Sequence, residues 1–166
     1  MIHIGIDPGL SGAIAVVSDD AVDVTDMPTL EIVVNKKHRR EINLHELRDI
    51  LAQFNQVECH VFLEKISGMP GMGGTTMFSL GRSYGQIEAT LVGIGLPVTK
   101  VPSMTWKKAM LPKSAIKGKE ASRARALEMF PAMAGKLSRK KDDGRAESLL
   151  IAEFGRRTHR DFGTAS

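Results

Sequence analysis

Four acidic residues stand at the predicted ends of secondary-structure elements, although they are far apart in the sequence. Asp7 closes the apolar run IHIGID and precedes a Pro-Gly pair, and Glu64 closes the run CHVFLE. Asp143 and Glu147 lie near the start of a predicted helix, one turn apart. Carboxylate oxygens are the ligands that Mg²⁺ prefers, and a pair of such ions can hydrolyse a phosphodiester. If these side chains meet, the chemistry that they fit is metal-dependent phosphodiester hydrolysis.

The last predicted helix explains why two of these acids should face inward. Leu150, Ile151 and Phe154 form an apolar stripe at helical spacing. The same line continues back through Glu147 to Asp143. A carboxylate on a core-facing stripe costs free energy unless a cation or hydrogen-bond donors satisfy it. Both acids are therefore candidate ligands of a cation.

Each acid also has a structural interpretation. Asp142 lies on a different helical line and is the better candidate for the N-cap. An aspartate before Pro-Gly, such as Asp7, is typical of a turn. The negative charge of Asp143 could simply interact favourably with the helix dipole. A glutamate near the sheet edge could instead form an ion pair with Arg82 or Arg145. The metal hypothesis therefore depends on all four acids converging, which spacing alone leaves open.

The elements that must position the acids follow from the hydrophobic pattern. The expected strands are residues 1–7, 12–18, 21–26, 58–64 and 96–102. The expected helices are 43–54 with Asn43 as N-cap, 75–94, 103–110 with Ser103 as N-cap, 120–130 stopped by Pro131, and 142–155 ending at Gly155. Residues 28–41 are ambiguous between a strand and an exposed basic loop. Three strands followed by alternating helices and strands predict an α/β fold with a mixed central sheet flanked by helices.

The length of 166 residues fits one domain, expected over residues 1–158, with 159–166 as a flexible tail. No apolar stretch approaches the roughly 20 residues that a membrane span needs, so no membrane partner is expected. The N-terminal residues do not show the pattern of a secretion signal, so none is expected, and the one cysteine, Cys59, excludes an internal disulfide. A reducing, cytoplasmic location is therefore expected.

Positive charge is concentrated in three segments, although the net charge is only +4. Residues 100–141 contain twelve Lys or Arg and two acids, a local excess of ten positive charges. The other clusters are NKKHRRE at 35–41 and RRTHR at 156–160. A single cluster of this kind can be an ordinary solubilising face. Three of them favour a polyanion, such as nucleic acid, as the partner.

Several stretches resemble the RuvC-type Holliday-junction resolvases, whose fold is RNase H-like. IGIDPGLSGAIAV resembles the first strand and turn of that family. VPSMTWKKAM, GKEASRARALEMFP and above all LSRKKDDGRAESLLIAEFG resemble the chloroplast resolvases and their bacterial and phage relatives. The resemblance extends from Ile2 to about Gly155. It implies a homodimer that binds a four-way DNA junction and nicks two opposing strands symmetrically, in a bacterial cell or a phage-infected host.

The resemblance also implies a site of two Mg²⁺ or Mn²⁺ ions in each subunit, held by the four acids. Carried over by position, Asp7 is the first-strand acid that bridges both metals, and Glu64 matches the second acid. Asp143 and Glu147 match the helix pair. Asp143 stands where the chloroplast pattern has histidine, so Asp142 is the alternative third ligand.

Other matched positions imply contacts with DNA. Lys119, in GKEASR, matches a basic position expected to contact the scissile phosphate. The loop 67–74 is expected to reach into the junction, or alternatively to be a flexible connector. Trp106 stacks on nucleic acid or anchors a helix, and the anchor is favoured. The expected DNA-binding residues are Met69, Met72, Phe78, Lys107, Lys108, Lys113, Lys117, Arg123, Lys140 and Lys141.

The functional hypothesis is a crossover junction endonuclease that depends on divalent metal ions. One alternative is a non-catalytic protein that binds branched DNA and retains the fold. The other is an RNase H-like nuclease that acts on flaps or RNA. The helix at 75–94 is rich in glycine and is expected to form the dimer interface, although small residues there would equally suit packing on the sheet.

Overall fold

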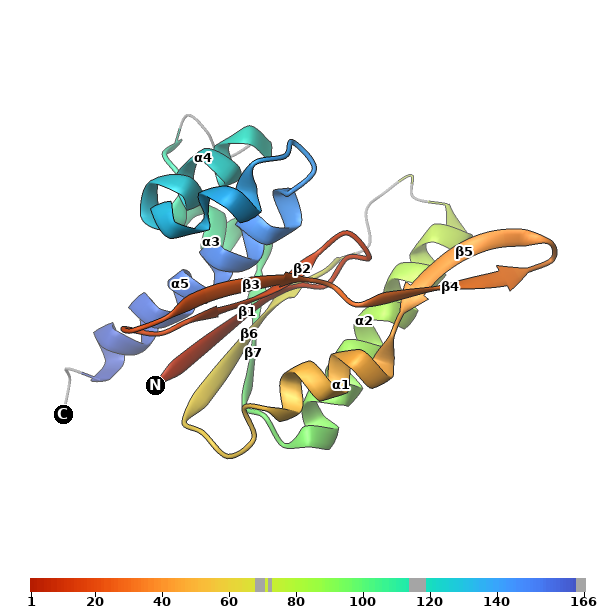
Figure 1. Ribbon diagram of the computed structural model, residues 1–166, viewed down its shortest axis with the longest axis horizontal. Coiled ribbons are helices and arrows are strands. Elements are labelled where there is room, and N and C mark those ends of the chain that lie inside the picture. Colours follow the sequence, from red (N-terminus) through yellow and green to blue (C-terminus); the bar gives the residue numbers. More distant parts are fainter. Residues whose placement is uncertain (68–70, 72, 114–118, 164–166) are drawn as a thin grey trace.

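The computed structural model describes residues 1–67, 71, 73–113 and 119–163, and of residues 119 and 160–163 the backbone only. Its centre is a five-stranded sheet in the order β3-β2-β1-β6-β7, with a separate hairpin β4-β5 (Figure 1). The strands are β1 (Ile2–Asp7), β2 (Ala13–Val17), β3 (Val22–Asp26), β4 (Thr29–Val34), β5 (Lys37–Ile42), β6 (Cys59–Lys65) and β7 (Val98–Pro102). β1, β2 and β3 pair antiparallel, whereas β6 and β7 continue from β1 in parallel. The predicted fold class, three antiparallel strands followed by parallel ones, is confirmed.

Helices cover both faces of the sheet (Figure 1). They are α1 (Leu44–Ala52), α2 (Gly74–Ile94), α3 (Ser103–Met110), α4 (Lys119–Met129), the 3₁₀ helix η2 (Pro131–Leu137) and α5 (Asp143–Gly163). Ile4 and Ile6 of β1 lie in the core shared with α1 and α2. Because side chains alternate along a strand, the odd residues of β1 point to the other face, where α5 packs. Asp7 therefore leaves β1 on the side of α5.

The helix α5 lies directly on the backbone of β1. A Cβ atom at Gly5 would stand 2.2 Å from the carbonyl oxygen of Ser148 and 2.4 Å from the backbone nitrogen of Ala152. Further along α5, a Cβ at Gly155 would stand 2.2 Å from two ring carbons of Phe62. Two missing side chains thus allow the close approach that brings the first turn of α5 to the end of β1.

Some predicted element ends are confirmed and others are wrong. The Asn43 side chain caps α1 as predicted. Ser103 is not an N-cap, because it is the first helical residue and Pro102, which holds the cap position, has no side-chain acceptor. The expected stop at Gly155 is also wrong, since this glycine makes room for an aromatic ring inside a continuous α5. Residues 159–163 of the expected tail belong to α5, and the rest of it lies outside the described residues. The single domain stays a prediction.

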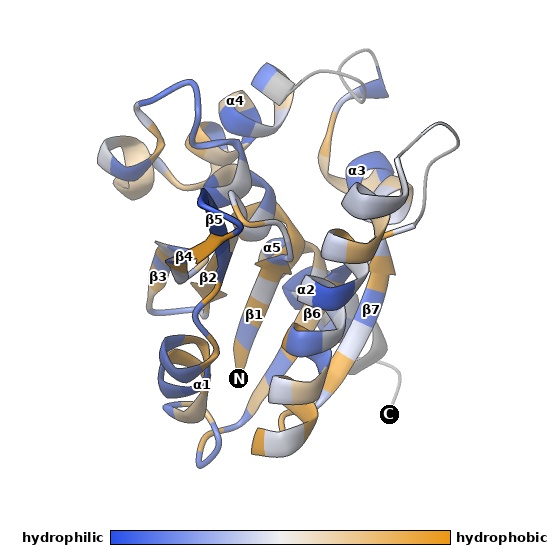
Figure 2. Ribbon diagram, turned by 90° about the vertical axis from the view of Figure 1, so that its right-hand side faces the viewer, coloured by the Kyte–Doolittle hydropathy of each residue, from blue (hydrophilic) through white to orange (hydrophobic). Residues whose placement is uncertain are grey.

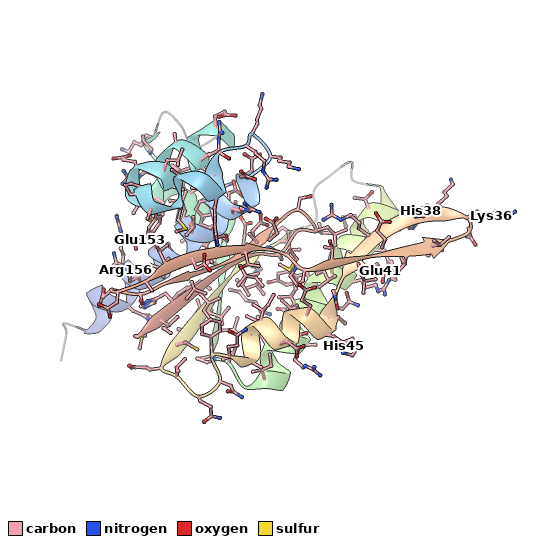
Figure 3. The ribbon with its side chains drawn as sticks, viewed as in Figure 1. Lys36, His38, Glu41, His45, Glu153 and Arg156 are labelled. Carbon is pink, nitrogen blue, oxygen red and sulfur yellow. The ribbon has the colours of Figure 1, made fainter. Side chains whose placement is uncertain are left out.

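The ambiguous segment 28–41 forms a hairpin that projects beyond α2 (Figure 1). Asn35 and Lys36 have φ angles of 51° and 62°, the left-handed values that a two-residue type I′ turn requires. Figure 2 shows hydrophobic β4 beside hydrophilic β5, and Figure 3 places Lys36 at the tip. Arg82 of α2 holds Glu41 of β5 through two hydrogen bonds of 2.6 and 3.0 Å. The second basic cluster is therefore a projecting arm tied to α2.

We expect Gly5→Ala to lower the free energy of unfolding, because the added methyl group meets backbone atoms of α5 that cannot rotate away. Overpacking of this kind typically costs about 1–3 kcal/mol, and contacts near 2.2 Å put the variant at the upper end. Denaturant unfolding measures the change. Gly135→Ala is the matched control, because a Cβ there meets nothing within 4 Å. Equal unfolding midpoints for the two variants would contradict the close packing of α5.

Candidate active site

Three of the predicted acids, each from a different element, meet at one edge of the sheet. Asp7 ends β1, Glu64 lies near the end of β6, and Glu147 lies in the second turn of α5. Ile6 pairs with Leu63 in the parallel register, so the two strand acids leave the sheet side by side. The charges of Glu64 and Glu147 both raise the pKa of Asp7. The convergence of these three carboxylates, which spacing could not establish, is present in the structure.

The carboxyl group of Asp7 has a strongly raised pKa. Burial, followed by the charges of Glu64 and Glu147, raises its pKa from 3.8 to about 7. The backbone N–H of Gly9 donates to Asp7 Oδ1 at 3.3 Å, and Lys107 also opposes the rise. The contact with Gly9 shows that the turn-forming interpretation of Asp7 holds as well. One carboxylate both shapes the turn after β1 and faces the other acids.

Glu147 is held from two other helices. Lys107 Nζ of α3 lies 3.2 Å from Glu147 Oε1, and Ser122 Oγ of α4 donates to the same oxygen at 3.3 Å. Burial raises the pKa of Glu147 and outweighs the opposing effect of Lys107, while the charge of Glu64 raises it further. The pocket therefore keeps an excess of negative charge even with a lysine in contact.

Glu64 accepts a hydrogen bond from Trp106 Nε1 at 3.1 Å. Trp106 is wholly buried, so it anchors α3, and the favoured interpretation of this residue is confirmed. The ammonium group of Lys107 lies 5.0 Å from the centre of the Trp106 ring. Consecutive residues of α3 thus contact carboxylates from two different elements.

A cavity of about 370 Å³ opens beside Asp7, Asp143 and Glu147. Gly144 forms part of its wall, and a Cβ at this residue would stand 2.3 Å from the carbonyl oxygen of Ser11. The turn after β1 therefore packs on the start of α5. A water molecule occupies about 30 Å³, so the cavity has room for hydrated ions and a phosphate group. The other lining residues are Gly9, Ser11, Gly12 and Lys141.

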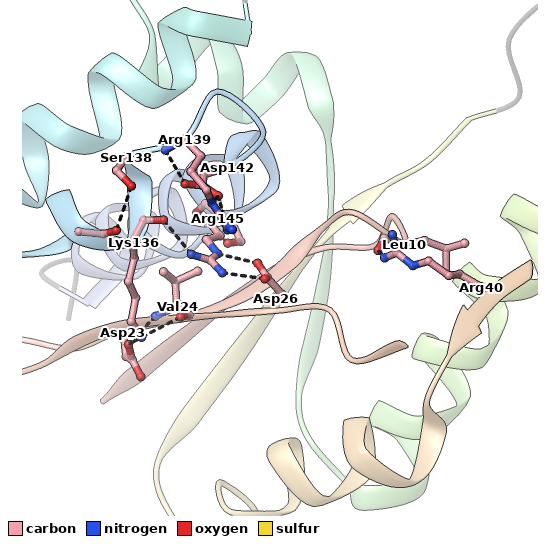
Figure 4. Close-up of polar contacts among 12 residues, drawn as sticks. Leu10, Asp23, Val24, Asp26, Arg40, Lys136, Ser138, Arg139, Asp142 and Arg145 are labelled. Carbon is pink, nitrogen blue, oxygen red and sulfur yellow. Dashed lines mark hydrogen bonds and ion pairs between the residues drawn. The ribbon is translucent and has the colours of Figure 1, made fainter. Parts of the chain in front are cut away.

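Asp142 is engaged elsewhere (Figure 4). The backbone N–H of Arg139 donates to Asp142 Oδ2 at 2.8 Å, and its guanidinium donates to Oδ1 at 2.7 Å. Burial alone would raise the pKa of Asp142, but these hydrogen bonds hold it below the ordinary value. Arg145, one alternative partner for the glutamates, binds Asp26 instead. Of the two neighbouring aspartates, Asp143 is the one that lines the acid cavity.

The third basic cluster is largely neutralised within the fold. Glu153 is buried and pairs with Arg156 at 2.7 Å and with Arg157 at 2.9 Å (Figure 3). Arg156 also reaches Asp19 at 3.2 Å. The pairs with Glu153 lie within α5, and the pair with Asp19 joins α5 to the β2–β3 turn. The ordinary structural interpretation therefore holds for this cluster.

The expected DNA-binding residues occupy different settings. Phe78 is 74% exposed on α2, and Arg123 pairs with Glu120 at 2.5 Å. Lys107 is drawn inward to Glu147, as described above, and of Lys119 only the backbone, at the start of α4, is described. Of the expected DNA-binding lysines, Lys108, Lys113, Lys140 and Lys141 are exposed and form no ion pair within the described residues. Met69, Met72 and Lys117 lie outside the described residues.

Sequence reasoning missed the contacts that hold the acids in place. It treated Trp106 as an anchor without a partner, and it assigned Lys107 to DNA alone. A signal was present, because SMTWKKAM directly follows β7, which pairs in parallel with β6 and so ends at the same edge of the sheet. Ser122 had no such signal, since it comes from a helix whose position the strands do not determine.

The site offers oxygen donors, which suit a hard divalent cation such as Mg²⁺ or Mn²⁺. Within the described residues, no group of three or more His, Cys, Asp or Glu is arranged tightly enough to hold a metal ion. Burial raises the pKa of Asp7 most, and the charges of Glu64 and Glu147 raise it further through repulsion. A cation placed between the acids would relieve this repulsion. The residues present therefore fit a divalent ion in donor type and in unbalanced charge.

Part of the chain is similar in sequence to a known resolvase. No protein-family model matches the chain. Over 86 residues, 52% of this chain, it is 38% identical to the Holliday junction resolvase MOC1, chloroplastic, of Chlamydomonas reinhardtii. The matched segment is 10% of that protein's length. The similarity agrees with the resemblance to the chloroplast resolvases expected from the motifs.

Two structures of Thermus thermophilus RuvC show which fold this is. One, in complex with a Holliday junction substrate, matches at a TM-score of 0.56 and 18% identity, over 95% of this chain and 96% of that one. The other matches at 0.56 and 15%, over 96% and 97%. The fold is that of RuvC. The RNase H-like architecture expected from the motifs is thus confirmed.

The comparisons leave the location of the protein open to test. The similar resolvase is a chloroplast protein by name. Within the described residues, no helix combines the length and the apolar composition that crossing a bilayer requires. The cytoplasmic location expected from the sequence stays a prediction.

We expect Asp7→Asn to stabilise the metal-free protein at pH 8. The folded-state pKa of about 7 lies above the ordinary 3.8, so the unfavourable charge is absent below pH 3.8, grows between pH 3.8 and 7, and is complete above pH 7. A shift of this size corresponds to about 2–4 kcal/mol in the free energy of unfolding. Denaturant unfolding in EDTA at pH 4 and pH 8 measures the difference, which should shrink at pH 4.

Asp20→Asn is the matched control, because this carboxylate is exposed in the β2–β3 turn. It should change the free energy of unfolding by less than about 0.5 kcal/mol at either pH. If Asp7→Asn behaves like Asp20→Asn at both pH values, Asp7 does not share a pocket with the other acids in solution.

Proposed function

We propose that this chain is a divalent-metal-dependent endonuclease that resolves four-way DNA junctions. The observation that carries the proposal is the meeting of Asp7, Glu64 and Glu147 in one partly buried pocket. Among the described residues, Lys107 forms an ion pair with one of these acids, which balances only part of their charge. Such a pocket suits cation-assisted chemistry on a phosphodiester. The RuvC fold and the similarity to a Holliday junction resolvase support a DNA junction as the substrate.

The proposed metal ligands are the four predicted acids, Asp7, Glu64, Asp143 and Glu147, with Mg²⁺ or Mn²⁺ as the ions and two ions per subunit. Bound there, the ions would supply an activated water and stabilise the leaving 3′ oxygen. The residues of the chain fix the carboxylates against their mutual repulsion. Lys107 also places a positive charge beside the position where a phosphate would enter. The products would carry 5′-phosphate and 3′-hydroxyl ends.

The DNA-binding surface proposed here consists of exposed cations around the acid pocket. Lys141 lines the cavity itself, and Arg39 of the hairpin lines a neighbouring cavity with the turn after β1. Together with the exposed lysines of α3 and of the segment before α5, these residues place positive charge around a negative centre. Phosphate contacts of this kind orient DNA without reading its sequence. Lys119 is proposed to approach the scissile phosphate from the start of α4.

The proposed assembly is a homodimer that pairs through α2. Phe78, Gly81, Gly85 and Val92 follow one another at helical spacing and are all exposed. Phe78 and Val92 are each 74% exposed, an unusual setting for large apolar side chains. A Cβ at either glycine meets nothing within 4 Å, so the face is open. A two-fold dimer would present two equivalent pockets to opposing DNA strands, as symmetric nicking requires.

The nuclease proposal predicts that the chain nicks a synthetic four-way junction in Mg²⁺ or Mn²⁺ and that Asp7→Asn abolishes this cleavage. The loss should reach about 10³-fold, because charge stabilisation by a metal contributes several kcal/mol to the transition state. Junction binding should persist or improve, since the variant removes a negative charge that repels phosphate. Gel assays of binding and cleavage, at fixed salt, measure both.

A substrate panel separates the proposal from its alternatives. Four-way junction, duplex, flap and RNA–DNA hybrid are compared at the same salt, with Asp20→Asn as the control that should cleave normally. Binding of the junction without cleavage in either ion would favour a non-catalytic junction-binding protein. Preference for flaps or hybrid would favour an RNase H-like nuclease with another substrate.

The dimer proposal predicts that Gly85→Arg yields a folded monomer. The monomer fold tolerates the side chain because it enters open space, whereas a facing subunit would be displaced. Light scattering coupled to gel filtration measures the mass. Gly135→Arg, at an equally open position on η2, is the matched control and should remain dimeric. A monomeric wild-type chain, or a dimeric Gly85→Arg variant, would contradict pairing through this face.

A further inference from the structure

We propose that Trp106 is a positioning residue, whose indole N–H holds the Glu64 carboxylate in the orientation that the pocket needs to bind a divalent cation. This inference rests on the proposed function, because it assigns a role toward the proposed metal ions. The key contact is the hydrogen bond of 3.1 Å from Trp106 Nε1 to Glu64 Oε1.

Trp106 is itself immobile, which is what a positioning group requires. It has no exposed surface and lies in the core between the sheet, α4 and α5. An indole nitrogen is a donor only, and a buried donor without a partner is costly. Glu64 Oε1 is the acceptor that it has. The bond is therefore maintained from the tryptophan side by packing and by the need of the N–H group for an acceptor.

Glu64 is the acid that most needs such a restraint. It stands near the end of β6, is partly exposed, and faces two carboxylates whose pKa values its own charge raises. Repulsion from Asp7 and Glu147 favours rotation of its long side chain toward solvent. The indole N–H opposes that rotation and occupies one carboxylate oxygen. The other oxygen remains as a ligand for a cation.

The position of α3 explains why Trp106 can reach Glu64. Glu64 pairs with Val101 in the parallel register of β6 and β7, and α3 begins immediately after β7. The next residue, Lys107, turns toward Glu147. The two contacts differ in kind, since Lys107 adds a positive charge whereas Trp106 adds a directed donor without charge. Only the second restrains a ligand without competing with the cation for it.

Trp106 is the only tryptophan of the chain, so the proposal has a direct spectroscopic readout. The protein should give a single indole N–H resonance in a ¹⁵N-correlated spectrum. We expect Mg²⁺ to shift this resonance, and Mn²⁺ to broaden it and quench tryptophan fluorescence, because the ions would bind the group that the indole contacts. The wild-type protein is used throughout, so no variant has to fold for this measurement.

The second measurement compares Mn²⁺ affinity in Trp106→Phe and in the wild type by calorimetry. Phe keeps an aromatic ring but lacks the N–H donor, and the expected loss is about 10-fold or more, as is typical for groups that orient metal ligands. Junction cleavage by the variant should recover as Mn²⁺ concentration rises. A purely structural defect would not be rescued by metal.

Phe62→Leu is the matched control for packing, because Phe62 is buried in the same core cluster and its side chain has no group that could hydrogen-bond to the acids. It should lower stability while leaving Mn²⁺ affinity within about twofold. Equal Mn²⁺ affinity in Trp106→Phe and the wild type, or an indole resonance indifferent to both ions, would overturn this proposal alone. A wild-type chain that binds neither ion would overturn the proposed function together with it.

Discussion

Repulsion among carboxylates at one end of the sheet is the constraint on which the rest of the structure depends. Asp7, Glu64 and Glu147 come from three elements, and their burial together is unfavourable for folding: burial raises the pKa values of Asp7 and Glu147 most, and the neighbouring carboxylates raise them further. A fold that assembles them must compensate elsewhere. The large cores on both faces of the sheet provide that compensation.

The acids are brought together by the close approach of α5 to β1. Glycines, which have no side chain, allow this approach. Gly5 lets α5 touch β1, and Gly144 lets the start of α5 touch the turn that follows Asp7. The lack of a side chain at Gly155 likewise leaves space for the ring of Phe62. These glycines do not supply unusual backbone angles. They set the distance at which Glu147 reaches the strand acids.

The sequence predicted the strands, most helices and the acids, because period-two and helical patterns and the ends of apolar runs are local signals. The prediction failed where the structure depends on a contact between residues that are far apart in the sequence. Gly155 was read as a helix stop, because the residue that requires a glycine there, Phe62, lies in β6, far away in the sequence. Ser103 was read as a cap, although the helix begins directly from a strand ending in Pro102.

The same distinction applies to the site. Helical spacing placed Glu147 on an inward line, yet it could not reveal that Trp106 and Lys107 serve the neighbouring carboxylates. That information depends on which strand pairs with which, because β7 ends beside Glu64 only through the parallel register of β6 and β7. Helical spacing did place Asp142 on a different line from Asp143, but it could not reveal what Asp142 contacts. The decisive contact, with Arg139, lies in the turn before α5.

The arrangement of charge gives the pocket its chemical character. The acids that Lys107 incompletely neutralises lie at the centre, while exposed lysines and the basic hairpin lie around them. Under the proposed function, a DNA backbone would be attracted to the periphery and repelled at the centre, so the periphery alone would hold a strand away from the acids. Under the proposed function, a divalent ion reverses the sign at the centre. The bound ion then raises the affinity for DNA, and bound DNA raises the affinity for the ion, since the free energy that couples two bound ligands is reciprocal.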